Sequence, residues 1–304
     1  RINNVDIYVT GSNSKFLSSD IITEFRGRGE EIKVYPLSFQ EFMSVYKENE
    51  LKGWSEYITY GGLPLVVLMN TDERKMKYLE EQRKNVYIND VIERNNLKEN
   101  NELETLVQII SSSIGSLTNQ KRLSDTFKSE MNLDISQNTI GQYLKFLEEA
   151  FIVEKANRYD VKGKKYINTP IKYYFSDIGI RNSFINFRQD EETHIMENII
   201  FLELKRRGYN VDVGIVEDRG KDYYKQLEVD FIANKGNNRI YIQSAYSIPT
   251  KEKREQEERS LLKINDAFKK IIIVKDYIKR GRDEKGVITM NIFDFLLDEK
   301  SLEY

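Results

Sequence analysis

The chain has 304 residues, of which 39% are hydrophobic and 32% are charged, and its formal net charge is -2. This length exceeds the usual span of one hydrophobic core, so it predicts two or three domains. The sequence has no Cys and a single His, His194, which excludes disulfides, thiol nucleophiles and Cys-ligated metal sites. Any metal must therefore bind to carboxylates. No apolar run is long enough to cross a membrane, and we expect a cytoplasmic protein.

The first predicted element is a strand over residues 5–10, a β-branched run that the polar residues GSNS follow. Proteins of the α/β class place ligand contacts at the carboxyl ends of strands, which makes Ser12 and Asn13 candidates. A turn or a helix cap is the simpler interpretation of these residues. Arg26 and Arg28 follow, and they predict either an anion contact or ordinary solvated charge.

Residues 39–110 are predicted to be helical, with one break at the GGLP segment, 61–64. The order changes over 119–176, where a helix, a turn and a second helix precede two strand-like runs. Ser136 is the predicted N-cap of the second helix. Helix, turn, helix and hairpin is the order of a winged helix.

The predicted hairpin is basic, because residues 158–174 contain five Lys or Arg and a single acid, Asp160. Such a stripe predicts contact with nucleic-acid phosphates, and the preceding helix offers amide and ammonium groups to a DNA groove. A winged helix that makes only protein–protein contacts is the alternative. The candidate DNA-binding residues are Asn138, Gln142, Lys145, Arg158, Lys162, Lys164, Lys165 and Lys172.

Residues 191–299 predict the order αβββαβα, which is typical of an α/β domain. Glu197 lies among apolar residues on one helix face, and an acid in that position needs a partner or a ligand. Strand alternation places Glu228 and Asp230 on one face, with Gln243 on the next strand. Together these residues predict a site for a hard cation such as Mg²⁺. A structural network of hydrogen bonds and ion pairs is the alternative.

The run IYVTGSNSKFLSS…RGRGEEIKVYPLSFQEF, residues 7–42, resembles the second half of an AAA+ ATPase module in a large prokaryotic group of uncharacterised proteins. Downstream segments, from YINDVIERNNL to YIQSAYSI, resemble the C-terminal domain of that group. The resemblance implies that Asn13 is a sensor residue and that Arg28 is an arginine finger. No GxxxxGK[ST] motif occurs, so ATP and Mg²⁺ are expected only in a full-length protein, and this chain alone would be inactive.

The αβββαβ order also resembles the PD-(D/E)XK nuclease fold, in which Glu197 and Asp230 match the helix acid and the strand Asp. The pattern next requires Glu-x-Lys, and the chain has Gln243-Ser244-Ala245 there, so a degenerate site is expected. The predicted fold is a multi-domain α/β protein. Its predicted domains are the AAA+ remnant (1–42), a helical lid or linker (43–115), a winged helix (116–185) and a nuclease-like domain (186–304).

Three functions follow from these patterns. The first is the C-terminal portion of an AAA+ ATPase that couples ATP hydrolysis to binding of DNA or a protein partner. The second is a Mg²⁺-dependent DNA nuclease, and the third is a non-enzymatic binding module. The sequence leaves the partner and the oligomeric state open.

Overall fold

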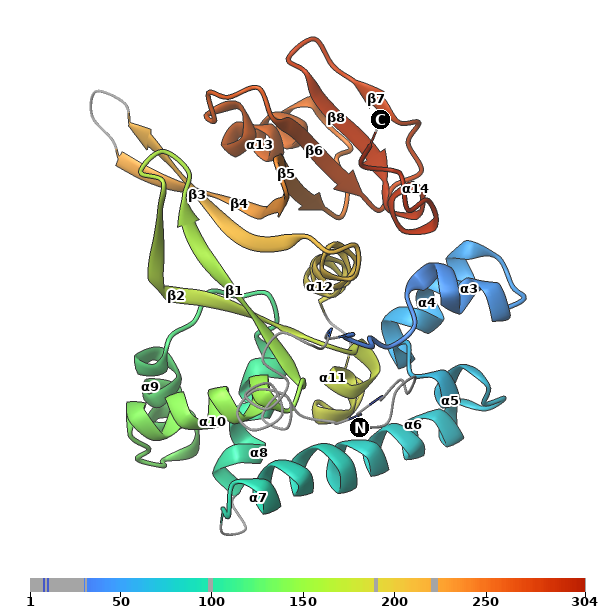
Figure 1. The fold of residues 1–304 in the computed structure, drawn as a ribbon, viewed down its shortest axis with the longest axis vertical. Coiled ribbons are helices and arrows are strands. Elements are labelled where there is room, and N and C mark those ends of the chain that lie inside the picture. Colours follow the sequence, from blue (N-terminus) through green and yellow to red (C-terminus); the bar gives the residue numbers. More distant parts are fainter. Residues whose placement is uncertain are drawn as a thin grey trace, which may run out of the picture.

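The computed structural model describes residues 8, 10, 30, 32–97, 101–188, 191–219 and 224–303. Asn13 and Arg28, the sensor and arginine-finger candidates, lie outside the described residues. The described part is a mixed α/β structure in which helices cover a large mixed sheet (Figure 1). No helix within these ranges is long and apolar enough to cross a membrane.

The first half of the described chain is helical, as predicted, and the GGLP segment breaks it between α4 and α5. Ser38 caps α3 with a capping box, because its hydroxyl accepts from Glu41 N and the Glu41 carboxylate accepts from Ser38 N. Three consecutive elements, α6, η2 and α7, form one long rod (Figure 1). The bounds are α3 Phe39–Val45, α4 Glu50–Tyr60, α5 Pro64–Val67, α6 Asp72–Glu81, the π-helical η2 Gln82–Ile88, α7 Asn89–Arg94 and α8 Asn101–Ser112.

The helix–turn–helix–hairpin order is also present. It comprises α9 (Gln120–Met131), α10 (Gln137–Glu149), β1 (Val153–Asp160) and β2 (Lys165–Phe175). The predicted cap of α10 is confirmed, because the Ser136 side chain accepts from Thr139 N at 3.1 Å. A bridge between Thr118 and Ile171 ties the segment before α9 to β2.

The remaining elements place a single long helix against most of the sheet. They are α11 Ile178–Phe184, α12 Glu192–Arg206, β3 Asn210–Arg219, β4 Tyr224–Lys235, β5 Asn238–Ala245, α13 Lys251–Leu262, β6 Lys269–Val274, β7 Gly281–Arg282, β8 Val287–Asn291 and α14 Ile292–Leu297. Ten successive residues of α12, 195–204, are buried. Helix α12 is therefore covered on all sides, between the sheet and the helical half (Figure 1).

The eight described strands form one sheet in the order β2-β1-β3-β4-β5-β6-β8-β7. The hairpin of the predicted winged helix joins the strands of the predicted C-terminal domain, because Arg158–Asp160 of β1 pairs in parallel with Val213–Ile215 of β3. The sheet therefore continues across the predicted boundary at 185/186. Strand β8, which pairs in parallel with β6, was not predicted because its five residues are all buried and show no alternation.

The GGLP segment (61–64) and the start of α11, which are distant in sequence, pack against each other. The buried Asp177 carboxylate accepts from Gly62 N at 2.8 Å and from Ile180 N at 2.9 Å. A Cβ on Gly179 would lie 2.0 Å from Tyr60 O, so only glycine allows this close approach. The GGLP break thus fixes α4 against the start of α11.

Candidate functional site: a buried lysine–carboxylate cluster

Four charged side chains predicted to serve two different functions meet at one point between α12 and the sheet. Lys172 Nζ donates to Glu197 Oε1 at 2.8 Å and lies 2.7 Å from Glu228 Oε1. Asp230 lies beside this pair, and its Oδ2 accepts from Ser244 N at 2.7 Å. We call Lys172, Glu197, Glu228 and Asp230 the lysine–carboxylate cluster.

Strand and helix periodicity explain why these side chains converge. Lys172 and Tyr174 alternate along β2 and therefore face the same way, toward Glu197 in the middle of α12. The Tyr174 hydroxyl donates to Glu197 Oε1 at 2.6 Å, and its ring stacks on Phe201 at 4.3 Å between centroids. The β2 hairpin thus supplies both partners of the helix acid.

Burial and like charge shift the protonation of the cluster. Burial raises the pKa of the Asp230 carboxyl well above its usual range, and the nearby Glu197 raises it further. Burial opposes the charge of Lys172, but Glu197, Asp230 and Glu228 outweigh it, so the pKa of Lys172 is raised. Burial also lowers the pKa of Arg158, and Glu228 partly offsets this effect.

The cluster does not fit a Mg²⁺ site. The Lys172 ammonium lies against both Glu197 and Glu228, in the space where a cation would have to bind its carboxylate ligands. Among the described residues, no group of three or more His, Asp or Glu side chains is arranged to hold a metal ion. The residues instead match the alternative prediction, a structural network of ion pairs and hydrogen bonds.

Gln243, the fourth predicted member, points to the opposite face of the sheet. Ser260 Oγ of α13 donates to its Oε1 at 3.3 Å. Its neighbour Ile242 belongs to the core on the α12 side, whereas Tyr241 and Ala245 pack with α13, so strand alternation directs Gln243 away from the cluster. The placement of Gln243 in one site with Glu197 and Asp230 is therefore wrong, and Ser244 contacts Asp230 instead.

The predicted DNA-binding residues separate into three groups. Lys172 and Arg158 are 4% and 9% exposed and belong to the surroundings of Glu197 and Glu228, so the prediction that they contact phosphates is wrong. The hairpin-tip lysines Lys162, Lys164 and Lys165 are exposed. The α10 residues Asn138, Gln142 and Lys145 are exposed as well.

The two exposed groups lie far apart. The tip of the β1–β2 hairpin lies beside the free end of β3–β4, whereas α10 packs near the opposite end of the hairpin (Figure 1). Lys162 Nζ donates to Glu217 O of β3 at 3.0 Å, and Val161 N donates to Ile215 O at 3.1 Å, which holds the tip against β3. The exposed residues among the predicted DNA contacts therefore lie on two separate surfaces.

The sequence contained a signal for Lys172 that the charge pattern obscured. Glu197 on an apolar helix face required a buried partner. In the sequence, Lys172 is followed by three aromatic residues, Tyr173, Tyr174 and Phe175, and the structure buries all four side chains. Counting charge along the hairpin could not distinguish this Lys from those at the tip.

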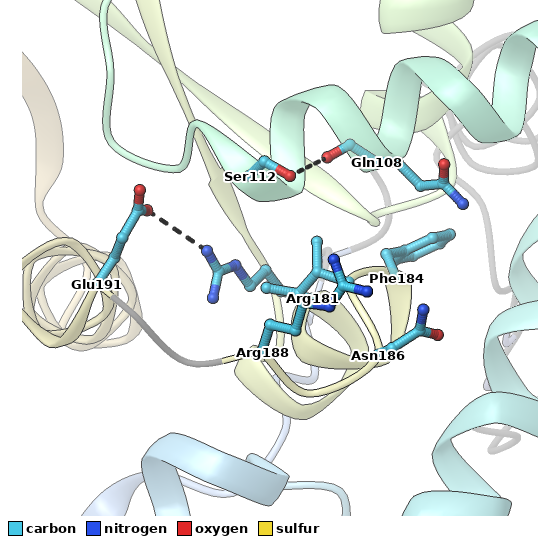
Figure 2. A pocket seen from close by; sticks show the side chains of 8 residues that line it. Gln108, Ser112, Arg181, Phe184, Asn186, Arg188 and Glu191 are labelled. Carbon is cyan, nitrogen blue, oxygen red and sulfur yellow. Dashed lines mark hydrogen bonds and ion pairs between the residues drawn. The ribbon is translucent and has the colours of Figure 1, made fainter.

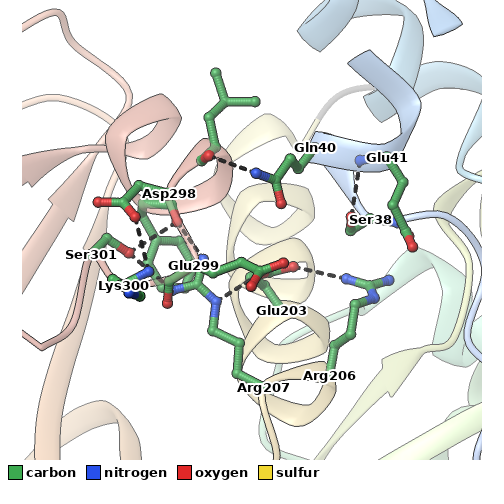
Figure 3. A network of polar contacts seen from close by, with 12 residues as sticks. Ser38, Gln40, Glu41, Glu203, Arg206, Arg207, Asp298, Glu299, Lys300 and Ser301 are labelled. Carbon is green, nitrogen blue, oxygen red and sulfur yellow. Dashed lines mark hydrogen bonds and ion pairs between the residues drawn. The ribbon is translucent and has the colours of Figure 1, made fainter. Parts of the chain in front are cut away.

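A second polar network fixes α3 and the residues just before it to the C-terminal part of the chain (Figure 3). Gln40 Nε2 donates to Leu297 O at 2.9 Å, and Arg206 Nη2 donates to Pro36 O at 3.0 Å. Glu203 on α12 accepts from Arg206 at 2.9 Å and from Arg207 at 2.7 Å. Arg207 in turn donates to the Ser301 hydroxyl and to two backbone carbonyls, those of Phe295 and Glu299.

Comparison with family models finds two matches. Residues 1–43 match the model of an AAA domain, and residues 51–191 match a domain of unknown function (DUF8612). The AAA match covers the segment that resembled an AAA+ module and ends in α3. Neither model describes a nuclease.

Two curated relatives are similar over most of the chain, and both are uncharacterised. A protein of Haemophilus influenzae is 37% identical over 97% of this chain and 71% of its own length. The protein MJ1544 of Methanocaldococcus jannaschii is 30% identical over 89% of this chain, which spans 63% of that relative. The crystal structure of protein VC1899 from Vibrio cholerae aligns over 90% of this chain and 63% of its own at 11% identity, with a TM-score of 0.27, too low to inform on the fold.

Proposed function

Because the chain belongs to the same family as the uncharacterised Haemophilus influenzae protein, we propose that it is the C-terminal portion of an AAA-type ATPase. In this proposal, the full-length protein binds ATP and Mg²⁺ with residues of the AAA module, including Asn13 and Arg28. The mixed sheet and its helices then respond to the nucleotide state and bind a partner, which we propose is DNA.

The observation that carries the proposal is the attachment of the AAA-matched segment to α12 and α14. Besides the contacts of Gln40 and Arg206, the Phe39 ring packs on Phe293 at 5.9 Å between centroids. Both rings are almost fully buried. A movement of α3 would therefore disturb buried aromatic packing and two hydrogen bonds, so it would be transmitted to the C-terminal helix.

Helix α12 supports the second step of this coupling, because it carries both the Glu203 network and Glu197. Glu203 follows Glu197 by six positions, about 1.7 helical turns, along one buried helix. Lys172 connects Glu197 to the hairpin, whose tip bears Lys162, Lys164 and Lys165. A rigid helix thus links the AAA-matched segment to a basic surface.

The exposed lysines of the hairpin tip support DNA as the partner. Phosphate contacts release counterions, so binding weakens with salt in proportion to the contacts made. We expect Lys164→Gln/Lys165→Gln to weaken binding of duplex DNA by about tenfold and to reduce the salt slope by about 2. The matched control is Lys251→Gln/Lys300→Gln, which removes two exposed lysines elsewhere.

The decisive experiment measures ATP hydrolysis by the full-length protein with and without DNA. We expect Mg²⁺-dependent hydrolysis that DNA accelerates, with the acceleration lost in Lys164→Gln/Lys165→Gln and kept in the control. Absence of ATP hydrolysis in the full-length protein would refute the ATPase proposal. An unchanged salt slope in the tip variant would refute DNA contact by these lysines.

A second candidate, a Mg²⁺-dependent nuclease, has one observation in its favour: Glu197 of α12 lies together with Glu228 and Asp230 of β4, beside Lys172 of β2. It has less support, because a bound cation would require Lys172 to give up its ion pairs with Glu197 and Glu228. Metal-dependent DNA cleavage that disappears in both Glu197→Ala and Asp230→Ala would establish it. Cleavage that survives either substitution would exclude this site.

A further inference from the structure

A pocket of about 350 Å³ lies between α8, α11 and Glu191, the residue before α12 (Figure 2). Its lining includes the amides of Gln108 and Asn186, the Ser112 hydroxyl, and the charged groups of Arg181, Arg188 and Glu191. The volume falls in the range of small-molecule sites. Two arginines and one glutamate give the lining a net positive charge.

The floor of this pocket is a buried arginine, Arg181, whose Nη2 forms a long ion pair with Glu191. Arg181 is 1% exposed, and it donates from Nε to Ser111 O at 2.8 Å and from Nη1 to Asn182 Oδ1 at 3.0 Å. Nη2 faces Glu191 Oε2 at 3.6 Å, which is too far for a hydrogen bond (Figure 2). Glu191 Oε2 is itself buried and accepts no hydrogen bond from any residue that the structure describes.

The arrangement of Arg181 Nη2 and Glu191 Oε2 favours a ligand group that can both accept and donate a hydrogen bond. Nη2 needs an acceptor and Oε2 needs a donor, and a hydroxyl group provides both at once. Leaving the buried Oε2 without a donor costs about 1–3 kcal/mol, so a ligand hydroxyl that donates to Oε2 and accepts from Nη2 would be preferred. Burial lowers the pKa of Arg181 to about 10, and Glu191 partly offsets this, so the guanidinium stays charged at neutral pH.

The pocket wall also holds strained backbone. Asn186 and Phe187 are consecutive non-glycine residues in the left-handed region, with φ of 52° and 55°. Such conformations cost about 1–3 kcal/mol each and concentrate at ligand sites. Phe187 N donates to Asn182 O at 2.8 Å, which fixes the turn that brings Asn186 and the exposed Arg188 to the pocket.

We propose that this pocket binds a small phosphorylated molecule that carries hydroxyl groups, such as a sugar phosphate. A ligand hydroxyl bridges Arg181 Nη2 and Glu191 Oε2. Arg188 at the rim binds the phosphate, because a guanidinium presents two parallel N–H donors that match phosphate oxygens. Gln108 and Asn186 supply further amide donors and acceptors to the same ligand.

The test is calorimetric titration of the chain with ribose 5-phosphate, inorganic phosphate and ribose as separate probes. We expect ribose 5-phosphate to bind more tightly than either of the other two. Arg188→Gln should weaken its binding by about tenfold or more, the loss expected for one charge-assisted contact. Glu191→Met should weaken it by at least about threefold, whereas inorganic phosphate binding should respond only to Arg188→Gln.

The matched control is Arg282→Gln, which removes an exposed arginine on β7 and should leave binding unchanged. Arg188 is exposed, so its substitution does not threaten folding. Three results would overturn the proposal: no binding of ribose 5-phosphate up to about 10 mM, equal affinity for inorganic phosphate, or unchanged affinity in Arg188→Gln. None of these outcomes depends on ATP hydrolysis or DNA binding.

Discussion

At the scale of single residues, Lys172 explains how the buried acids Glu197 and Asp230 can lie close to the half-buried Glu228. Two of its ion pairs, with Glu197 and Glu228, are 2.8 and 2.7 Å long, and the ammonium group is almost inaccessible to water. A buried ion pair contributes little net stability, but removing one partner leaves the other charge uncompensated. Lys172 is therefore structurally important because its loss would leave the buried Glu197 carboxylate without an ion-pair partner.

Lys172→Met tests this role directly. The substitution keeps most of the side-chain volume and removes the charge, which leaves the buried Glu197 without its ion pair, beside Glu228, whose side chain is 33% exposed. We expect the free energy of unfolding to fall by about 3–5 kcal/mol, measured by urea denaturation at pH 7. Lys164→Met, which alters an exposed tip lysine, is the control, and equal stability of the two variants would contradict the cluster account.

Asp230 predicts a pH dependence of stability. Its pKa in the folded state is raised above the ordinary value of 3.8, so the folded state binds this proton more tightly than the unfolded state. The stabilising contribution is fully present below about pH 4 and is lost as pH rises through the folded-state pKa.

Asp230→Asn should remove this dependence. We expect the variant to be more stable than the parent by about 1 kcal/mol or more at pH 7, with a difference that shrinks toward pH 4. The amide oxygen can still accept from Ser244 N, which preserves the observed contact. Urea denaturation of both proteins across this pH range measures the effect, and a constant difference would exclude Asp230 as its source.

At the scale of elements, the junction of α4 with α11 depends on glycine. A Cβ at Gly179 would lie 2.0 Å from Tyr60 O, a backbone atom that cannot move without shifting α4. We expect Gly179→Ala to destabilise the protein by at least about 2 kcal/mol. The control is Gly281→Ala, where the nearest atom to the new Cβ would be 3.9 Å away, and its stability should change by less than about 0.5 kcal/mol. Thermal denaturation of both variants and the parent protein measures the two effects.

The same scale shows how far the sequence predicts the structure. Helix α8 follows from periodicity because its apolar residues repeat at spacings of three and four, and β3 to β5 follow from β-branched runs separated by turn residues. Strand β8 and the parallel pairing of β1 with β3 depend on partners distant in the chain, which no local pattern encodes. The candidate site shows the same limit. Local patterns predicted that Glu197, Glu228 and Asp230 lie together. The position of Lys172 beside them and the opposite orientation of Gln243 depend on tertiary contacts, which the local patterns do not encode.

At the scale of the whole molecule, one continuous sheet and one buried helix join regions that the sequence divided into separate domains. Helix α12 contacts the segment that ends the AAA match through Arg206, the C-terminal turn through Arg207 and the hairpin through Glu197. A structure connected in this way favours concerted movement over independent domain motion. This connection is the physical basis of the proposed coupling.

Amide hydrogen exchange of the full-length protein, with and without ATP and Mg²⁺, tests the coupling most directly. The account predicts that nucleotide changes exchange together in three segments, 36–45, 199–207 and 292–302, which contain the contacts of Gln40, Arg206 and Arg207. Gln40→Leu/Arg206→Gln should keep the change in the AAA module and lose it in the last two segments. A nucleotide response confined to the AAA module in the unmodified protein would contradict the account.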